Sequence, residues 1–533
     1  MKTIFRRSFF YLILIYSLLI LGVSMDILWK YSFKLDIFAI IIAVLGIFAL
    51  GREKELKFSE KLITVLFLSG LIFAIFLRTL PYIDNSVPLG YDPGIYKYVF
   101  EKFQSSLPGI PEQSLDKWIV SGFPSGLAVL TDIFYLLGLS SDQIIIPIYI
   151  LIASFTIFPI YLVSKKYFGK EAGVFSALLF SFSLTQLNVF WYFYYKNIIA
   201  MSFMLFALYF MDNKKFLIPT IIFAAATGFF HQPTFLILAA VWMAFTLVNF
   251  RNMELLKNGI LGIACTGILL LIIYSQRLSE LVIQPMESVF GSVVTPGTIG
   301  AGTFYNLFTY QYVSLVYLPL ALLGFFFLIK TRDFNPVFLW FLINGIIVVF
   351  KLLFYNRLII NLDIAGILLA GCGLAYGILY SQNLSKNIKM GVIIIILLTG
   401  AISVLKLSSD MRPLISEMQL ESVKKIQNFT ENNSLVMATT SSYSPWVIGY
   451  SNRTTIAPGL FDYDKWSKDD WIKFWSAGSA AEINPLMDVY DKPLYVFIGK
   501  HPSSSIINPQ KFSDACFIKA FEDDGGILYK YDC

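Results

Sequence analysis

The stretch from Leu62 to Tyr98 decides the fold class, because a long apolar run gives way in it to a short polar motif. It reads LITVLFLSGLIFAIFLRTL at 62–80, PYIDNSVPL at 81–89 and GYDPGIYKY at 90–98. A helix over the first of these segments is long enough to cross about 30 Å of hydrocarbon. The last segment places the carboxylate of Asp92 beyond the exit of that helix. The pattern predicts a membrane-spanning helix followed by an acidic group at the membrane surface.

The rest of the chain repeats the apolar half of this pattern. Of its 533 residues, 57% are hydrophobic and 14% are charged, and the mean hydropathy is +0.68. Soluble domains average about 45–50% apolar and about 25% charged residues. The sequence therefore predicts a polytopic α-helical membrane protein with about thirteen transmembrane helices. The candidate spans lie at 8–25, 35–50, 62–80, 144–163, 173–190, 196–211, 216–230, 234–250, 259–276, 311–329, 335–354, 358–381 and 389–405.

Basic residues determine the predicted orientation, since Lys and Arg are enriched in cytoplasmic loops. With a cytoplasmic N-terminus, the following residues all fall inside the cell: Lys2, Arg6, Arg7, Arg52, Lys54, Lys57, Lys61, Lys165, Lys166, Lys170, Lys214, Lys215, Arg251, Lys257, Lys330, Arg332, Lys386 and Lys389. We therefore predict a multi-pass protein of the cell membrane whose C-terminal part is extracytoplasmic. These loops account for the net charge of +6, so the expected partner is the lipid bilayer and no nucleic acid.

One segment, GFPSGLAVLTDIFYLLG at 122–138, is almost long enough to span but contains Pro124 and Asp132. Counting it as a span would reverse the orientation of every later loop. We therefore predict a helix at the outer interface. This leaves a first large outer loop at about 81–143 and a second at about 276–310. The glycines of the second loop predict a mobile cover, with an ordinary connection as the alternative.

The character of the sequence changes after Leu405. Residues 1–405 form the predicted transmembrane domain, whereas 406–533 contain no spanning run and alternate helical with extended patterns. Helices are expected at 412–428 and 461–475, and strands at 434–440 and 493–498. This composition predicts a small extracytoplasmic α/β domain.

A hairpin is expected to close this domain. If Asp524 and Gly525 form its two-residue turn, Cys516 and Cys533 face each other as a non-hydrogen-bonded pair. Such a pair brings the Cα atoms to about 4.5 Å, within the range of a disulfide, which an outer domain can keep oxidised. Two free thiols in a fraying terminus are the alternative.

The order of features resembles the GT-C superfamily of membrane glycosyltransferases, which includes protein O-mannosyltransferases, lipid A aminoarabinose transferases and the catalytic subunit of oligosaccharyltransferase. In such enzymes an acidic residue follows an early span, in a long outer loop that continues into interface helices. The motifs that carry the resemblance are Tyr91-Asp92-Pro93-Gly94-Ile95-Tyr96, Gly122-Phe123-Pro124-Ser125-Gly126, Tyr195-Lys196-Asn197, Phe230-His231-Gln232-Pro233, Tyr355-Asn356-Arg357-Leu358 and the hairpin at 521–531. The resemblance implies a GT-C-like fold and sugar transfer from a lipid-linked donor.

Departures from the family patterns narrow this expectation. The oligosaccharyltransferase subunit carries a Trp-Trp-Asp-Tyr-Gly signature, and the nearest segment here, SPWVIGY at 444–450, lacks the acid. The loop at 191–196 has no carboxylate to complete a metal site, and Pro93 follows Asp92 where O-mannosyltransferases have a second acid. The sequence thus favours transfer of one sugar from a polyprenyl or dolichyl monophosphate carrier. No cofactor is expected, and a divalent metal is not favoured.

Asp92 is the candidate catalytic base that takes the proton of the acceptor hydroxyl, in a reaction expected to invert the sugar's anomeric centre. The alternative is that Asp92 only caps the helix that starts at Pro93, because Asp before Pro is a favoured start. Both roles can hold together.

Cations are needed for the departing phosphate. Arg357 is the first candidate, because a guanidinium binds phosphate oxygens bidentately, and Lys196 is the second. His231, Tyr91 and Tyr96 are candidates for contact with the phosphate, the acceptor or the sugar. The alternatives are side chains that snorkel to headgroups, a structural histidine and an aromatic belt.

The expected partners are a polyprenyl- or dolichyl-phosphate-linked sugar and a glycan, lipid or protein acceptor. En bloc transfer of an oligosaccharide and a non-enzymatic transporter or scaffold stay open as alternatives. A transporter should carry charges near mid-membrane or break its helices there, whereas we expect these spans to be polar only near their outer ends.

Overall fold

The computed structural model describes residues 57–105, 122–275, 303–379, 386–459 and 463–533, together with positions 12, 15, 16, 19 and 119. Apart from four positions, the predicted spans at 8–25 and 35–50 lie outside the described residues, as does the glycine-rich part of the second outer loop.

The chain divides into two compact units, and each is described by itself. The helical unit comprises Met1–Leu80, Ile150–Phe190 and Tyr194–Asp410, and the mixed unit comprises Pro81–Tyr149, Trp191–Phe193 and Met411–Cys533.

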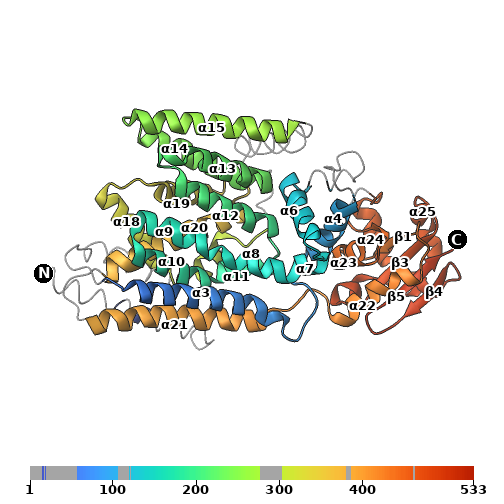
Figure 1. The fold of residues 1–533 in the computed structure, drawn as a ribbon. Coiled ribbons are helices and arrows are strands. Elements are labelled where there is room, and N and C mark those ends of the chain that lie inside the picture. The colour runs from blue at the N-terminus through green and yellow to red at the C-terminus, as the bar shows by residue number, and fades with distance from the viewer. Residues whose placement is uncertain are drawn as a thin grey trace. The chain divides into compact units, whose positions relative to one another are not determined.

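Apolar helices make up most of the described part of the helical unit (Figure 1). They are α3 (Glu60–Thr79), α8 (Tyr149–Phe155), α9 (Ile157–Phe168), α10 (Lys170–Ser181), α11 (Leu184–Trp191), α12 (Tyr195–Phe210), α13 (Leu217–Phe230), α14 (Gln232–Val248), α15 (Met253–Ile273), α17 (Leu307–Val313), α18 (Leu318–Thr331), α19 (Pro336–Val349), α20 (Tyr355–Gly373) and α21 (Lys386–Asp410). Each predicted span from 62–80 onward overlaps one of these helices or a consecutive pair, and the π-helical segments Ile144–Ile148 and Leu374–Leu379 extend α8 and α20.

Among the described residues, five helices are long and apolar enough to cross a membrane. Two bent pairs, α10 with α11 and α17 with α18, raise the number of apolar spans in the described residues from five to seven. The five are Glu60–Tyr82, Ser141–Phe168, Met253–Ile273, Tyr355–Leu379 and Lys389–Asp410. Shorter helices such as α13 and α19 have 14 residues each, which extend only about 21 Å. The expected count of about thirteen and the orientation are therefore not established and stay predictions.

Helix α20 forms the centre of the helical unit, where it packs against α10, α18 and α19. The apolar window of its span is buried throughout. Glycines allow its close contact with α18, since a Cβ at Gly324 would lie 2.0 Å from Leu369 O and one at Gly373 would lie 2.0 Å from Leu320 O. Small residues at helix contacts are typical of membrane proteins.

The described spans contain a buried acid and two bends that the sequence analysis did not single out. Asp363 is fully buried within α20, the α10–α11 pair bends by 49°, and the α17–α18 pair bends by 98°. Ser183 lies at the first break, where its Oγ accepts a hydrogen bond from Gln186 N at 3.1 Å. Tyr317 lies at the second break, directly before α18. Hydropathy averaged along the chain does not reveal such isolated polar positions.

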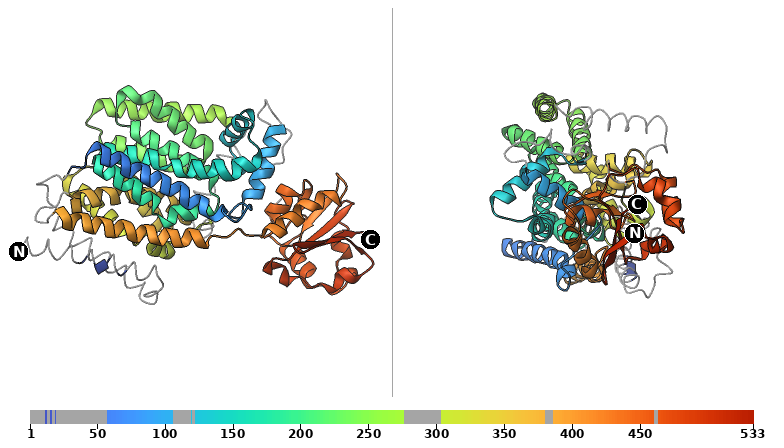
Figure 2. Two further views of the ribbon diagram at one scale, coloured as in Figure 1. Left: turned by 60° about the horizontal axis from the view of Figure 1, so that its bottom comes forward. Right: turned by 90° about the vertical axis from the view of Figure 1, so that its right-hand side faces the viewer.

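The mixed unit combines a five-stranded sheet with short helices (Figure 2). Its strands are β1 (Leu435–Ala438), β2 (Thr454–Ile456), β3 (Leu494–Gly499), β4 (Phe517–Glu522) and β5 (Gly526–Tyr531), in the order β2-β1-β3-β5-β4. β1 is parallel to β2 and β3, whereas β5 is antiparallel to β3 and β4. The helices are α4 (Pro93–Ser105), α6 (Ser125–Leu136), α7 (Ser141–Gln143), α22 (Glu417–Lys425), α23 (Ser444–Tyr450), α24 (Lys468–Ser476) and α25 (Ala480–Met487). The sequence predicted β1, β3, α22 and α24, but not β2, α23 or α25.

Helix α6 occupies the ambiguous segment at 122–138. Its 12 residues extend about 18 Å, too short to cross about 30 Å of hydrocarbon. The segment is therefore not a single straight span, although its place at a membrane interface stays a prediction. Residues 81–149 group with the C-terminal part of the chain, which begins after α21 ends at Asp410.

The closing hairpin departs from its predicted register. The turn Asp524–Gly525 is present, and the pairs next to it have the expected register. An irregularity at Ala520 then shifts the pairing by one residue, as an extra residue in one strand does. Cys516 accordingly accepts a hydrogen bond from Asp532 N at 3.0 Å instead of facing Cys533. The two cysteines are nevertheless joined by a disulfide, with their Cα atoms 5.1 Å apart.

Candidate functional site

Asp92 lies directly before α4 in the mixed unit. Its carbonyl accepts the N–H of Tyr96 at 3.0 Å, which begins the helix, and Pro93 occupies the first helical position. Asp and Pro are both favoured at these positions because the first turn leaves its N–H groups without intrahelical partners. The backbone of Asp92 thus starts α4, while its half-buried carboxyl group lies at the helix's positive end.

Helix α23 packs directly on the first turn of α4. A Cβ at Gly94 would lie 1.9 Å from Pro445 O, and a Cβ at Gly449 would lie 2.1 Å from Gly94 O. Only glycine permits this approach, so the GYDPG motif and SPWVIGY are packed together. Sequence reasoning noted both motifs but did not connect them. The only feature of the sequence that could have indicated their contact is the glycine in each motif.

Tyr91 belongs to the same contact. Its hydroxyl pairs with the Ser444 side chain, and burial together with the charge of Asp92 raises the pKa of Tyr91 well above its ordinary value. Both effects favour the neutral phenol close to the charge of Asp92.

Tyr96 is placed differently from the expectation that it contacts substrate. Its side chain is only 4% exposed. Its ring packs edge-to-face against Phe100, Phe123 and Phe193, with centroids 5.0–5.7 Å apart. Edge-to-face packing holds such rings in fixed orientations. Tyr96 thus anchors α4 instead of offering a free ring face to a sugar.

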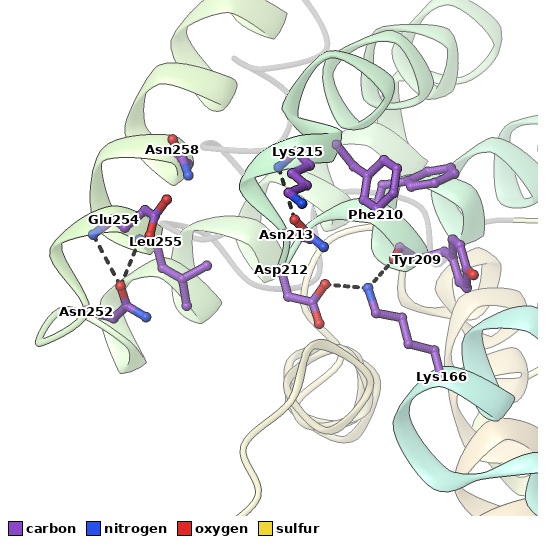
Figure 3. A pocket seen from close by; sticks show the side chains of 11 residues that line it. Lys166, Tyr209, Phe210, Asp212, Asn213, Lys215, Asn252, Glu254, Leu255 and Asn258 are labelled. Atoms are coloured by element: carbon purple, nitrogen blue, oxygen red, sulfur yellow. Dashed lines mark hydrogen bonds and ion pairs between the residues drawn. The ribbon is translucent and has the colours of Figure 1, made fainter.

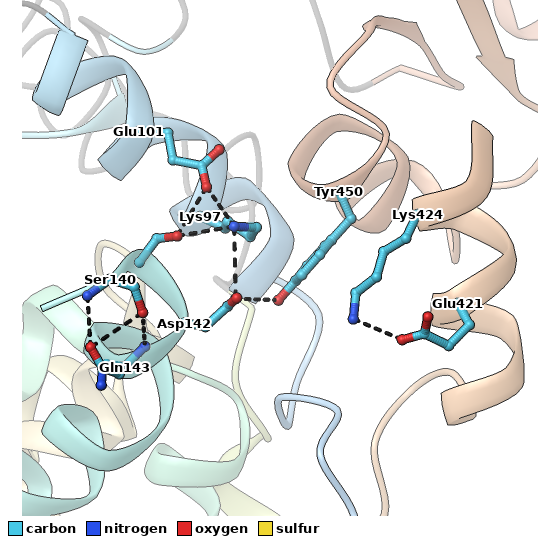
Figure 4. Close-up of polar contacts among 9 residues, drawn as sticks. Lys97, Glu101, Ser140, Asp142, Gln143, Glu421, Lys424 and Tyr450 are labelled. Atoms are coloured by element: carbon cyan, nitrogen blue, oxygen red, sulfur yellow. Dashed lines mark hydrogen bonds and ion pairs between the residues drawn. The ribbon is translucent and has the colours of Figure 1, made fainter. Parts of the chain in front are cut away.

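A polar network on α4 follows the motif (Figure 4). Lys97 Nζ contacts Glu101 Oε1 at 2.5 Å and Asp142 Oδ1 at 3.8 Å, and it lies 5.2 Å from the centre of the Tyr450 ring. Tyr450 donates to Asp142 Oδ1 at 3.4 Å. These contacts tie α4 to α7 and α23, so they stabilise the packing around Asp92.

The helical unit contains the other predicted site residues, with Arg357 in the first turn of α20. Arg357 Nη2 donates to Thr303 Oγ1 at 2.5 Å, and the guanidinium lies 5.7 Å from the centre of the Tyr194 ring. The Tyr194 hydroxyl donates to Thr303 O at 2.5 Å. Arg357 Nε is buried and has no hydrogen-bond partner among the described residues. A buried donor without a partner is costly, and an anionic ligand would satisfy it.

His231 lies close enough to both Lys196 and Arg357 to interact electrostatically with each of them. Lys196 is in the first turn of α12, and His231 lies in the turn between α13 and α14. His231 Nδ1 accepts from Thr234 N at 3.3 Å, so this side chain caps α14. Burial, followed by the charges of Lys196 and Arg357, lowers the pKa of His231 well below its ordinary value. His231 is thus a neutral capping residue at neutral pH, and the two cations supply positive charge around it.

One cavity of the helical unit is lined by none of the predicted site residues, and Figure 3 shows its lining. It has a volume of about 560 Å³, and its lining includes Lys166, Asp212, Lys215, Asn252, Glu254 and Asn258. Lys166 is paired with Asp212. No cluster of three or more His, Cys, Asp or Glu side chains that could hold a metal occurs in the described residues. That the activity needs no metal ion stays a prediction.

Comparison of the sequence with protein-family models and with curated proteins finds no match. Solved structures match the fold. The archaeal oligosaccharyltransferase AglB from Archaeoglobus fulgidus, in complex with an inhibitory peptide and a dolichol-phosphate, is 12% identical with a TM-score of 0.62, covering 89% of this chain and 74% of that chain. ArnT from Cupriavidus metallidurans, bound to undecaprenyl phosphate, is 14% identical with a TM-score of 0.56 over 88% and 98% of the two chains. The arabinofuranosyltransferase AftD from Mycobacteria is 12% identical with a TM-score of 0.61 over 91% and 41%.

These likenesses show a shared fold. The three matching proteins are membrane glycosyltransferases of the GT-C superfamily, so the resemblance indicated by the order of motifs holds at the level of structure. The apolar helices and this fold together indicate a membrane protein.

Proposed function

We propose that this protein is a membrane glycosyltransferase that moves a single sugar from a polyprenyl- or dolichyl-phosphate carrier to an acceptor on the outer face. The observation that carries the proposal is the Arg357 group. This is a half-buried guanidinium that Thr303 holds beside Tyr194 and whose Nε has no hydrogen-bond partner in the part of the chain that the structure describes. Such a group suits a lipid phosphate, and the fold is one in which solved structures contain dolichol-phosphate or undecaprenyl phosphate.

In the proposed reaction the acceptor oxygen attacks the sugar's anomeric carbon and the bond from that carbon to the phosphate oxygen breaks. Asp92 takes the acceptor proton, and the lipid phosphate leaves with the bonding electrons. Attack opposite the leaving group inverts the anomeric centre. Arg357 and Lys196 stabilise the negative charge that develops on the phosphate.

Two other functions have specific observations in their favour. The likeness to AglB favours en bloc transfer of an oligosaccharide, although SPWVIGY lacks the acid of the oligosaccharyltransferase signature. The buried Asp363 and the two bent helix pairs are features expected of a transporter. The experiment that tests the proposal therefore has to distinguish single-sugar transfer, en bloc transfer and transport.

The test is reconstitution in liposomes with two donor panels, polyprenyl monophosphate sugars and polyprenyl pyrophosphate oligosaccharides. We expect transfer only from a monophosphate donor, and a loss of about 10²–10⁴-fold in kcat for Asp92→Asn, as for removal of a general base. Arg357→Ala should lose activity at least as strongly. Transfer from the pyrophosphate panel would favour en bloc chemistry, and donor movement across the membrane without transfer would favour a transporter.

Matched controls are available in each unit. Asp84→Asn changes an exposed acid of the same loop as Asp92, and Arg332→Ala removes an exposed cation from the end of α18. Both should transfer sugar at the wild-type rate. Undiminished transfer by Asp92→Asn would show that Asp92 is not the base.

A further inference from the structure

We propose that Asp363 is a positioning residue that holds the Arg357 group in place by joining α20 to the breaks of two bent helix pairs. This inference rests on the proposed function only in taking the ligand of Arg357 to be a lipid phosphate. Asp363 itself lies within the helix and is not proposed to touch substrate.

A buried acid in an apolar helix needs compensation, because a charge or an unpartnered carboxyl group in such a place is costly. Asp363 forms no ion pair within the described part of the chain, and hydrogen-bond donors surround it instead. Gln186 Nε2 donates to Oδ2 at 2.8 Å and Ser183 Oγ donates to Oδ2 at 3.1 Å, while the Tyr317 hydroxyl donates to Oδ1. The Tyr310 hydroxyl is a further partner of the carboxyl group.

These donors come from the two places where helices are broken. Ser183 lies at the 49° bend and Gln186 in the first turn of α11, while Tyr317 precedes α18 at the 98° bend. Broken helices are tolerated inside a membrane where side chains satisfy the freed polar groups. One carboxylate therefore connects three chain segments: the start of α11, the α17–α18 break and α20.

The far ends of α11 and α17 come together with α20 at the Arg357 group. Tyr194 follows α11, Thr303 precedes α17, and Arg357 lies on α20 six residues before Asp363, or about 9 Å along the helix. Arg357 donates to Thr303, and Tyr194 also donates to Thr303. The buried contact at Asp363 thus sets the relative position of the segments that build the proposed phosphate contact.

The alternative is a purely structural role, in which Asp363 only contributes to the stability of the helical unit. A well-packed apolar residue often contributes as much stability as a buried charge. The two roles differ in their coupling to Arg357. A positioning residue acts through Arg357, so its replacement should have no further effect once Arg357 is gone, whereas independent effects add.

The test measures binding of undecaprenyl phosphate and transfer kinetics for Asp363→Leu, Asp363→Asn and Ser183→Ala, each alone and with Arg357→Ala. We expect Asp363→Leu to weaken binding and raise KM at least about tenfold, and Asp363→Asn to recover most of the loss. Tyrosine and serine hydroxyls can reorient toward the amide. In the Arg357→Ala background the effect of Asp363→Leu should vanish.

Asn361→Leu is the matched control, because it also removes a buried polar side chain from α20 and should leave the lipid affinity unchanged. If wild type binds no undecaprenyl phosphate, the assignment of the ligand fails, and with it the proposed function. If wild type binds but Asp363→Leu and Ser183→Ala bind equally well, or if their losses add to that of Arg357→Ala, the positioning role is wrong. Should Asp363→Leu not fold, the milder Ser183→Ala decides.

Discussion

Gly94 shows how strongly one residue constrains the candidate site, because α23 contacts its backbone without space for a side chain. We expect Gly94→Ala to destabilise the mixed unit by about 1–3 kcal/mol, the usual cost of overpacking, and to lower transfer by shifting Asp92. Thermal unfolding and the transfer assay check both effects. Gly122→Ala is the control, since a Cβ there meets nothing within 4 Å. Equal unfolding temperatures for the two variants would contradict the tight contact.

Individual residues also show how far the sequence leads. Asp92 and Arg357 could be selected because each lies at the end of an apolar run next to a recognisable motif. Thr303 and Ser444 could not, since their contacts join segments far apart in the chain. Asp363 was overlooked because one acid hardly alters the hydropathy of a long apolar helix. Residue type and local position identify candidates, but the partners follow only from the fold.

At the scale of elements, the closing hairpin depends on its turn. Burial alone would raise the pKa of Asp523, but hydrogen bonds from Lys425, Ser422 and the N–H groups of Gly525 and Gly526 outweigh it and lower the pKa to about 2. Because the pKa of Asp523 is lower in the folded than in the unfolded protein, its ionised form stabilises the fold at pH values above the unfolded pKa of about 3.9. This stabilisation is lost as the pH falls through the folded pKa of about 2.

Replacing Asp523 should therefore reduce stability at neutral pH but not in strong acid. We expect Asp523→Asn to cost on the order of 1–2 kcal/mol at pH 7 and almost nothing near pH 2. Chemical denaturation of the protein at a series of pH values measures this difference. Asp524→Asn, at the neighbouring turn position, is the control. A cost that does not depend on pH would contradict the charge-based account.

The disulfide of the same hairpin gives a second prediction for this element. Cys516 and Cys533 are 17 residues apart, and closing a loop of that size stabilises a fold by about 3 kcal/mol through the unfolded chain. Reduction, or the double replacement by serine, should lower the unfolding temperature of the mixed unit. Cys265→Ser, which changes a free cysteine, should not. An unchanged unfolding temperature after confirmed reduction would contradict the prediction.

Elements were predicted better than their irregularities. The apolar runs predicted helices because burial in lipid or protein favours them over any other backbone arrangement. The bends at Ser183 and Tyr317, and the shift at Ala520, were not predicted. Each depends on contacts with other segments, and these are invisible in local periodicity. The disulfide is present even though the register that suggested it is shifted, because the range of Cα distances in disulfides is wide.

At the scale of the whole molecule, the sidedness of the chain is the largest prediction from the loop charges. In intact cells, a membrane-impermeant maleimide should label Asp469→Cys in α24 and not Lys257→Cys in α15; both positions are exposed. Inverted vesicles should give the opposite result. The unsubstituted protein, with free Cys265 and Cys372, is the control. Labelling of Lys257→Cys from outside would reverse the orientation and with it the proposed outer face.

The packing of α4 on α23 has a consequence for biosynthesis. The ribosome delivers the GYDPG motif early, whereas α23 follows only after the entire helical unit. Until Met411–Cys533 has been made, the Gly94 face of α4 lacks its partner and the newly made protein exposes an unfinished surface. Shortened chains that end before α23 should therefore be targets for membrane quality control, however many of their helices have already inserted.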